Sequence, residues 1–386
     1  MSKLKWVFIG SLRNKNSDMA AYSAAGQLAQ AGFIKGCINT EYEPITIYSM
    51  PLRRIFPKNN LLVIQEFSDG IYQSGYINLP LLKQVSFALN ILSRVLTKHD
   101  YKFIICYNPS FALLLYGLLI QRCKKIDFIP MLYDIILPNS NTGNATLAAI
   151  NYKVYKKFLK YFNKTIVISK SIIADFHIEN SSIIIEGGLP QDTIVKFDTA
   201  DTHTLSKSQT FKIVFAGGLE KENGLEEMIE AVKMIKSDEV HLYIYGSGPL
   251  SENMNIWIEN HNNIHVMGYL EHDILIEHIK NADLLLNIRI DQKLSTKYFF
   301  PSKLIEYMYS GVPILSTDFE SLPEEYKAHL YLTKEDPISI SESIKNIINS
   351  SEFERRGKAI ENKKWIIEEK SWNKQSNKII NWALDN

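Results

Sequence analysis

Short apolar runs alternate with longer amphipathic stretches along the chain, and this alternation predicts strands separated by helices. The predicted strands of the first half are Leu4–Ile9, Ile45–Tyr48, Leu61–Ile64, Phe103–Tyr107, Asp127–Leu132, Thr165–Ile168 and Ser182–Ile185. Helices are expected near residues 18–31, 80–98, 109–122 and 144–162. Such alternation is typical of parallel sheets covered by helices, so the sequence predicts an α/β fold.

Residues 198–210 hold one large apolar side chain and form the clearest linker in the chain. The same rhythm restarts after them, with strands expected at Lys212–Ala216, His241–Tyr245, Ile264–Met267, Leu284–Ile288 and Pro313–Ser316. Two helices are expected near 337–350 and 352–369, followed by an amphipathic segment. We therefore predict two doubly wound, Rossmann-like domains, residues 1–200 and 201–370. Facing domains of this kind place the carboxyl ends of their strands around an interdomain cleft, where ligands bind.

Composition narrows the class of protein. The chain of 386 residues is 46% hydrophobic and 22% charged, as in soluble globular proteins. A net charge of +1 gives no argument for nucleic-acid binding. Three cysteines without a CxxC pair favour a reducing compartment and indicate no zinc site. The start of the sequence has no signal-peptide pattern, and the apolar run Phe111–Ile120 is too short to span a bilayer. We expect a cytoplasmic protein, at most attached to the inner face of a membrane.

Residues 299–318 are the most informative segment, because they predict a loop, a helix and a buried strand in succession. Pro301 suits a first helical turn, and the amides of Ser302, Lys303 and Leu304 then form an anion site at the helix N-terminus. Lys303 adds a positive charge. Glu306 lies one turn further on the same face, where a carboxylate can accept hydrogen bonds from a ribose diol. This spacing fits a nucleoside diphosphate, although an ordinary helix with a surface Lys and Glu has the same spacing.

Three predicted strand-to-helix turns in the second half contain glycine: Gly217-Gly218, Gly246-Ser247-Gly248 and Gly268-Tyr269-Leu270. Glycine lets the backbone approach a ligand and leaves amides free for phosphate. Such turns also use glycine for steric reasons alone, so it is their combination with residues 299–318 that indicates a nucleotide site.

The second half, from about residue 180, resembles the nucleotide-sugar domain of family-4 retaining glycosyltransferases of the GT-B fold. The ordered motifs that carry the resemblance are Ile213–Leu219, Leu225 to Ala231, Tyr243–Pro249, Val266–Leu270, Asn281–Asn287 and residues 299–318. The first half is similar only in its strand rhythm, as expected for an acceptor domain.

The resemblance implies roles for individual residues. Glu306 would bind the ribose hydroxyls, while the amides of Ser302, Lys303 and Leu304 would hold the diphosphate. Gly217, Gly218 and the Gly246 turn would approach the phosphates, and Tyr269 and Leu270 would flank the base. The closing helix, residues 371–386, would pack back on the first domain.

Three charged residues that the family usually uses are absent from their places, which hold Tyr298, Gly218 and Asn223. A surface-polysaccharide branch of the family resembles this chain in having an Arg after the fourth strand and a Phe-Pro-Ser-Lys segment. A departing diphosphate needs positive groups when no metal motif is evident. We therefore expect the replacements to come from the nearest cations in the sequence, which are Arg289, Lys297, Lys303 and Lys221.

In the first half, Gly10 follows the first strand and is expected to line the cleft. Asp134 follows the strand Asp127–Leu132 and is the acidic candidate on this side; a loop carboxylate or a helix cap has the same pattern. The family often has His-Asp at this place. Tyr133 replaces the His here, so the resemblance implies no general base.

The sequence, together with this resemblance, predicts a transferase that moves a sugar from a UDP- or GDP-linked donor to a hydroxyl of a glycan or lipid-linked acceptor in surface-glycan synthesis, without a metal or another cofactor. The resemblance implies that the reaction is retaining. Two alternatives remain: a degenerate member that only binds nucleotide sugar or glycan, and a GT-B nucleotide-sugar epimerase.

A contact with anionic membrane is a further expectation. The lysine-rich helix of residues 151–164 carries Lys153, Lys157, Lys160 and Lys164 at helical spacing, and Arg53–Phe56 is a second candidate. A core helix with a solvated lysine face has the same pattern.

Overall fold

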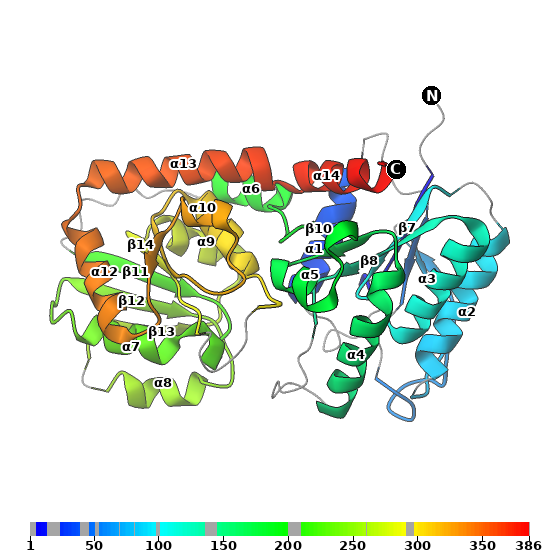
Figure 1. The fold of residues 1–386 in the computed structure, drawn as a ribbon. Coiled ribbons are helices and arrows are strands. Elements are labelled where there is room, and N and C mark those ends of the chain that lie inside the picture. The colour runs from blue at the N-terminus through cyan, green and yellow to red at the C-terminus, as the bar shows by residue number, and fades with distance from the viewer. Residues whose placement is uncertain are drawn as a thin grey trace. The chain divides into compact units, whose positions relative to one another are not determined.

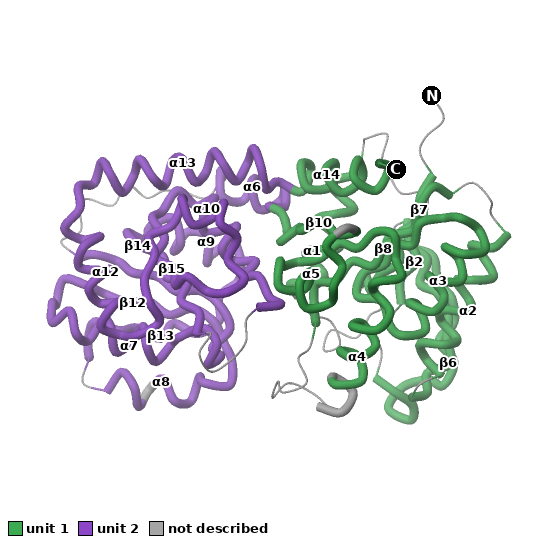
Figure 2. Tube along the Cα trace, viewed as in Figure 1, with its two compact units in different colours: residues 1–188, 372–386 green, residues 189–371 purple. Residues whose placement is uncertain are grey.

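The computed structural model describes residues 5–13, 24–38, 46–50, 54–68, 70–80, 82–97, 101–135, 145–199, 210–259, 261–290 and 297–385. The chain divides into two compact units, coloured separately in Figure 2. Unit 1 contains residues 1–188 and 372–386, and unit 2 contains residues 189–371. The division precedes helix α6 (Gln191–Thr199), which packs on helices of unit 2, whereas the sequence placed the boundary after residue 200. Most of the predicted linker lies outside the described residues.

Unit 1 is built on an eight-stranded sheet in the order β10-β9-β8-β7-β1-β2-β5-β4. Its strands are β1 (Val7–Gly10), β2 (Thr46–Ser49), β4 (Glu66–Ser68), β5 (Ile71–Gln73), β7 (Phe103–Tyr107), β8 (Asp127–Leu132), β9 (Thr165–Val167) and β10 (Ser182–Ile184). Neighbouring strands are parallel except β4, which runs antiparallel to β5. Most of these strands follow the predicted runs, which are buried because helices cover both faces of the sheet.

The predicted strand Leu61–Ile64 does not join this sheet. It forms β3 (Leu62–Val63), which pairs antiparallel with β6 (Tyr76–Ile77) in a separate two-stranded sheet. The segment between them contains the antiparallel pair β4–β5, so the chain returns beside β3 in the opposite direction. The sequence did not predict β4, β5 or β6, which are two or three residues long.

Helices cover both faces of the unit 1 sheet (Figure 1). On one face lie α2 (Leu82–Thr97), α3 (Phe111–Lys124), α4 (Ala145–Phe158) and α5 (Lys170–Phe176). The connections from β5 to β7 and onward through β8 and β9 to β10 all cross the sheet in one direction, so right-handed crossovers place their helices on the same side. On the other face α1 (Ala24–Cys37) packs against α14 (Trp372–Leu384).

The α1–α14 contact is close. A Cβ atom at Gly32 would lie 2.1 Å from the indole nitrogen of Trp372, so a side chain at this position would displace the tryptophan. The Ser376 hydroxyl also donates to the Phe33 carbonyl at 2.9 Å. The last described helix of the chain therefore completes the core of unit 1.

Unit 2 contains a six-stranded sheet in the order β13-β12-β11-β14-β15-β16, and every neighbouring pair is parallel. The strands are β11 (Phe211–Ala216), β12 (Val240–Tyr245), β13 (Ile264–Gly268), β14 (Leu284–Asn287), β15 (Ile314–Thr317) and β16 (Tyr331–Thr333), of which β16 was not predicted. Because all run the same way, the loops that follow them meet at one edge of the sheet.

Two helical layers enclose this sheet (Figure 1). One layer contains α6, α9 (His272–Lys280), α10 (Ser302–Ser310) and α13 (Glu352–Lys370); the other contains α7 (Leu225–Lys233), α8 (Ser251–Trp257) and α12 (Pro337–Asn349). The short helix α11 (Glu324–Lys327) connects β15 to β16. Strand residues such as Leu242, Ile244 and Leu286 are fully buried between the layers. Each unit is thus a Rossmann-like domain.

Candidate functional site

The first element of the candidate site is the N-terminus of α10. Pro301 is the N-cap, with an extended backbone, and does not lie in the first turn as the sequence predicted. Its carbonyl accepts the Leu304 amide at 2.8 Å, so Leu304 does not supply a free donor, contrary to expectation. Within the described part of the chain, the amides of Ser302 and Lys303 have no partner. The anion site at this helix end therefore has two backbone donors.

Glu306 lies one turn into α10 with its side chain 13% exposed. His272 Nε2, from the start of α9, and Lys303 Nζ both contact Oε2, at 3.3 and 3.2 Å. Burial alone would raise the pKa of this carboxyl, but the bond with His272 and the charge of Lys303 bring it below its ordinary value. Glu306 is therefore ionised at neutral pH. Its Oε1 has no partner among the described residues and can accept a hydrogen bond.

Tyr307 fixes α10 against the sheet. Its buried hydroxyl accepts the Ala216 amide at 2.7 Å and donates to the Ala216 carbonyl at 3.1 Å. The ladder between β11 and β14 ends at Val214, so without Tyr307 the polar groups of Ala216 on this side would lack a strand partner. This contact ties the helix that carries Glu306 to the strand that leads into Gly217.

The three glycine turns are joined by backbone hydrogen bonds. The Gly217 amide donates to the Tyr245 carbonyl at 3.0 Å, and the Gly246 amide donates to the Gly268 carbonyl at 2.8 Å. These two amides are thus occupied, and the sequence was wrong to expect them free. A Cβ atom at Gly246, whose φ is +141°, would lie 1.8 Å from the Gly217 carbonyl oxygen, so this turn excludes a side chain. The Gly218 amide has no partner within the described ranges.

The turn after β13 exposes part of its residues. The Tyr269 side chain is 67% exposed and Leu270 is half-buried, so both have surface available for a planar ring. His272 lies two residues after Leu270 and directs its ring to Glu306, which connects this turn to α10.

Three of the predicted cations follow strands of unit 2. Thr317 Oγ1 holds the backbone of Arg289 on both sides, at 2.8 Å from its amide and 3.0 Å from its carbonyl. The guanidinium lies 4.8 Å from the Phe299 ring centre, and Lys297 Nζ lies 5.0 Å from that of Tyr298. Lys221 is exposed in the 3₁₀ turn after Gly218. Residues 291–296 lie outside the described part.

Unit 1 contains a separate cavity of about 360 Å³ at the carboxyl ends of β1, β7 and β8. Asp134 lines it, together with Gly10, Ser11 and Asn151. A Cβ atom at Gly10 would lie 2.3 Å from Gln30 Oε1, so glycine keeps room for the Gln30 side chain.

Asp134 is held by neutral donors. Asn108 Nδ2 at 2.9 Å and the Tyr107 hydroxyl at 3.3 Å both donate to Oδ2. The protein around Asp134 raises the pKa of its carboxyl by desolvation, although these two bonds oppose the rise. Asp134 is exposed and lines the cavity, and its Oδ1 has no partner among the described residues.

Two glutamines hold the loop that follows β1. Gln30 Oε1 accepts the Ser11 amide at 2.8 Å, and Gln27 donates to the Ser11 carbonyl at 2.6 Å while accepting the Arg13 amide at 2.8 Å. The cavity wall is therefore fixed by side chains of α1.

Sequence reasoning missed several residues of these sites. His272 had a usable signal, because it begins a predicted helix directly after a glycine turn. Tyr107 ends a predicted strand and Asn108 follows it, beside the predicted strand that leads to Asp134, so adjacent parallel strands could have indicated them. The part of the chain that the structure describes contains no three His, Cys, Asp or Glu side chains placed to share a metal ion.

The fold is that of GT-B glycosyltransferases, with two Rossmann-like domains. The chain is similar to trehalose-6-phosphate synthase OtsA, with a TM-score of 0.70 at 10% identity over 99% of both chains. It is similar to sucrose-phosphate synthase from Thermosynechococcus elongatus, with a TM-score of 0.66 at 13% identity over 98% of both. It is also similar to HepE from Anabaena in complex with UDP, with a TM-score of 0.64 at 14% identity, over 98% of this chain and 100% of the other.

Residues 197–366 match the family model of group 1 glycosyl transferases, so the match lies within unit 2. No curated protein matches the sequence. The family model and the fold together support a GT-B glycosyltransferase. Among the described residues, no helix combines the length and apolarity needed to cross a bilayer.

Proposed function

We propose that the protein is a retaining glycosyltransferase that moves a sugar from a nucleoside diphosphate sugar to an acceptor hydroxyl in surface-glycan synthesis. The observation that carries this proposal is the end of α10, where two unpaired amides precede an ionised carboxylate with one open oxygen. The amides of Ser302 and Lys303 suit a diphosphate, and Glu306 Oε1 suits a ribose diol. HepE, which has the same fold, has been crystallised with UDP-glucose.

Charge stabilisation of the leaving diphosphate comes from the protein in this proposal. Lys303 lies in the first turn of α10 and Arg289 has its backbone fixed by Thr317, so both cations start from ordered positions. The Gly218 amide adds a donor. Retention is supported by the resemblance of the second half of the chain to family-4 retaining glycosyltransferases, and the surface-glycan role by the resemblance of residues 299–318 to the surface-polysaccharide branch. In this proposal the leaving phosphate takes the proton of the acceptor, and no metal is required.

The cavity of unit 1 suits the acceptor. Amides and hydroxyls dominate its polar lining, Asp134 is its carboxylate, and no Lys or Arg is among its described lining residues. An acceptor that presents uncharged hydroxyls, such as the end of a glycan, fits this lining better than a sugar phosphate. Asp134 Oδ1 accepts the hydrogen bond of the attacking hydroxyl and orients it.

The test uses a panel of UDP- and GDP-linked sugars. A ligand that binds only the folded state raises the melting temperature, and the same donor is then incubated without acceptor to measure slow hydrolysis. We expect one donor to raise the melting temperature and also to be hydrolysed slowly. Stabilisation without hydrolysis or transfer would identify a binding subunit, conversion to another nucleotide sugar would identify an epimerase, and no stabilisation by any donor would contradict the proposal.

A further inference from the structure

The outer surface of α2, α3 and α4 has an unusual composition. These helices lie side by side on one face of the unit 1 sheet (Figure 1). Asp and Glu make up 42 of the 386 residues of the chain, yet these helices of 16, 14 and 14 residues contain none. In contrast, α13, with 19 residues, carries both signs of charge, as is usual for a helix that faces water.

Apolar side chains project from this acid-free layer. On α2 and α3 their spacing places them on one stripe of the helix, opposite its buried residues. The exposed residues are Leu82, Val85 and Leu89 on α2, Phe111, Leu115 and Leu119 on α3, and Ile150 on α4, with exposed fractions from 39% to 58%. We call this set, with the α4 lysines described next, the helical face. Scattered exposed apolar residues need no explanation, but an adjoining set on neighbouring helices marks an interaction surface.

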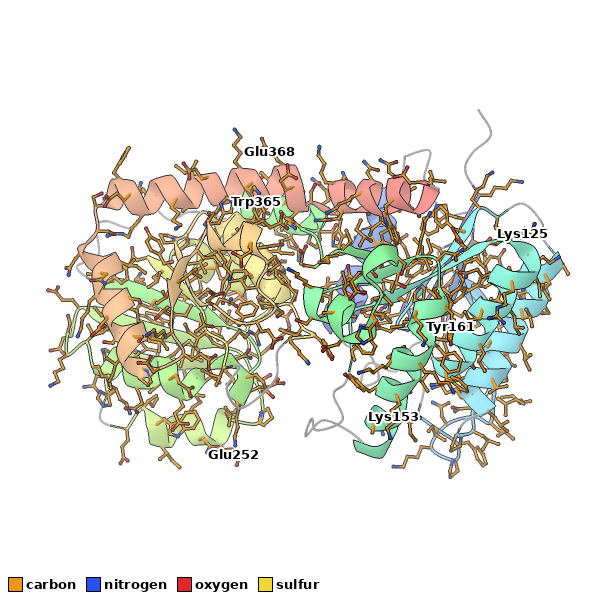
Figure 3. All side chains as sticks on the ribbon, viewed as in Figure 1. Lys125, Lys153, Tyr161, Glu252, Trp365 and Glu368 are labelled. Carbon is orange, nitrogen blue, oxygen red and sulfur yellow. The ribbon has the colours of Figure 1, made fainter. Side chains whose placement is uncertain are left out.

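Lysines border the apolar set. Lys153, Lys157 and Lys160 follow Ile150 along the same stripe of α4 and the 3₁₀ turn after it, and all three are exposed; Figure 3 labels Lys153 and Tyr161 there. Lys164, which the sequence grouped with them, instead donates to the carbonyls of Ala383 and Asp385 at the end of α14. The cationic border is therefore made by three lysines of the predicted four.

We propose that the helical face binds the surface of an anionic lipid bilayer. An aliphatic centre with a cationic border and no carboxylate complements acyl chains beneath negatively charged headgroups. A helical face that meets only water, or a typical protein partner, would not need to exclude acidic residues from all three helices. The proposal concerns α2 and α3 as well as α4, and it does not depend on the donor site, since vesicle binding is measured without any nucleotide.

The experiment is co-sedimentation of the full chain with vesicles of phosphatidylglycerol and phosphatidylcholine, at low and high salt, with pure phosphatidylcholine vesicles for comparison. We expect binding to the anionic vesicles that weakens with salt. Leu89→Asp with Leu119→Asp, and separately Lys153→Glu with Lys157→Glu, should each weaken it by at least about ten-fold.

Matched controls lie on the opposite face of the same unit. Leu28→Asp on α1 makes the same kind of change at one exposed leucine, and Lys374→Glu with Lys378→Glu on α14 reverses the charge of two exposed lysines; both should leave binding unchanged. Thermal melting checks that every variant is folded. Absence of binding to anionic vesicles, or equal loss in the controls, would overturn the proposal. So would dimerisation without lipid that the Leu89/Leu119 variant abolishes, because the occupant would then be a second copy.

Discussion

Glu306 in unit 2 and Asp134 in unit 1 are held by the same arrangement with opposite electrostatic results. Each accepts two contacts on one carboxylate oxygen, and in each the other oxygen has no partner among the described residues. Cationic or basic groups hold Glu306 and lower its pKa, whereas a phenol and an amide hold Asp134, whose pKa is raised by desolvation. The identity of the two donors therefore decides whether a carboxylate remains a fixed charge or responds to its surroundings.

The largest expected effect concerns the cation beside Glu306. Lys303→Met should lower turnover by about 10²–10³, because it removes a charge placed where negative charge develops on the leaving group. Steady-state transfer assays measure this, with Lys364→Met, an exposed lysine of α13, as control. Turnover within a few-fold of the parent would place the diphosphate elsewhere.

The two carboxylates should separate donor binding from transfer. Glu306→Gln should weaken donor binding about 10–100-fold, since a hydrogen bond to a charged group is worth about 1.5–3 kcal/mol. Asp134→Asn should leave donor binding and donor hydrolysis unchanged while transfer falls by up to about 100-fold through misplacement of the acceptor. Calorimetric titration and parallel assays of hydrolysis and transfer check this, with Glu277→Gln on α9 as control. Equal loss of donor affinity in both variants would remove the distinction.

The tyrosines behind the two sites should also differ. Tyr307→Phe leaves the Ala216 amide and carbonyl without their partner and should lower the free energy of unfolding by about 1–3 kcal/mol. Tyr107→Phe removes one long bond from Asp134, which keeps Asn108, and should cost less than about 1 kcal/mol. Denaturant titrations compare them; a larger loss from Tyr107→Phe would contradict this order.

The smallest effect is the dependence of stability on pH. The folded pKa of Glu306 is lowered from 4.5, so its stabilisation is present above that value and is lost as pH falls through the folded pKa. The folded pKa of Asp134 is raised from 3.8, so stability is lost as pH rises through it. At neutral pH, Glu306→Gln should lower the melting temperature by about 2–4 °C for each kcal/mol of unfolding free energy that is lost. Asp134→Asn should leave the melting temperature equal or higher. Melting curves between pH 3 and about 7 test whether the stability contributions of Glu306 and Asp134 change in opposite directions as the pH rises.

The fold was predictable where the hydrophobic pattern is long. Buried parallel strands such as Phe103–Tyr107 and Asp127–Leu132 match the prediction because both of their faces pack on helices. The two-residue strands β3 and β6 were not predictable as a pair, since a short apolar run does not encode its partner. At the site, Glu306 and Lys303 follow from helical spacing, whereas the contact of His272 depends on the packing of α9 on α10. The occupied amides of Gly217 and Gly246 depend on hydrogen bonds between separate strands, which no local motif reports.

The position of Trp372 against Gly32 has a consequence for biosynthesis. Unit 1 is interrupted in sequence by all of unit 2, so the ribosome makes α14 only after residues 189–371. Until then the groove beside α1 lacks its tryptophan, and the nascent first unit exposes apolar surface that it later covers. Unit 2, whose residues are contiguous, can reach its native packing first, even though its synthesis begins second.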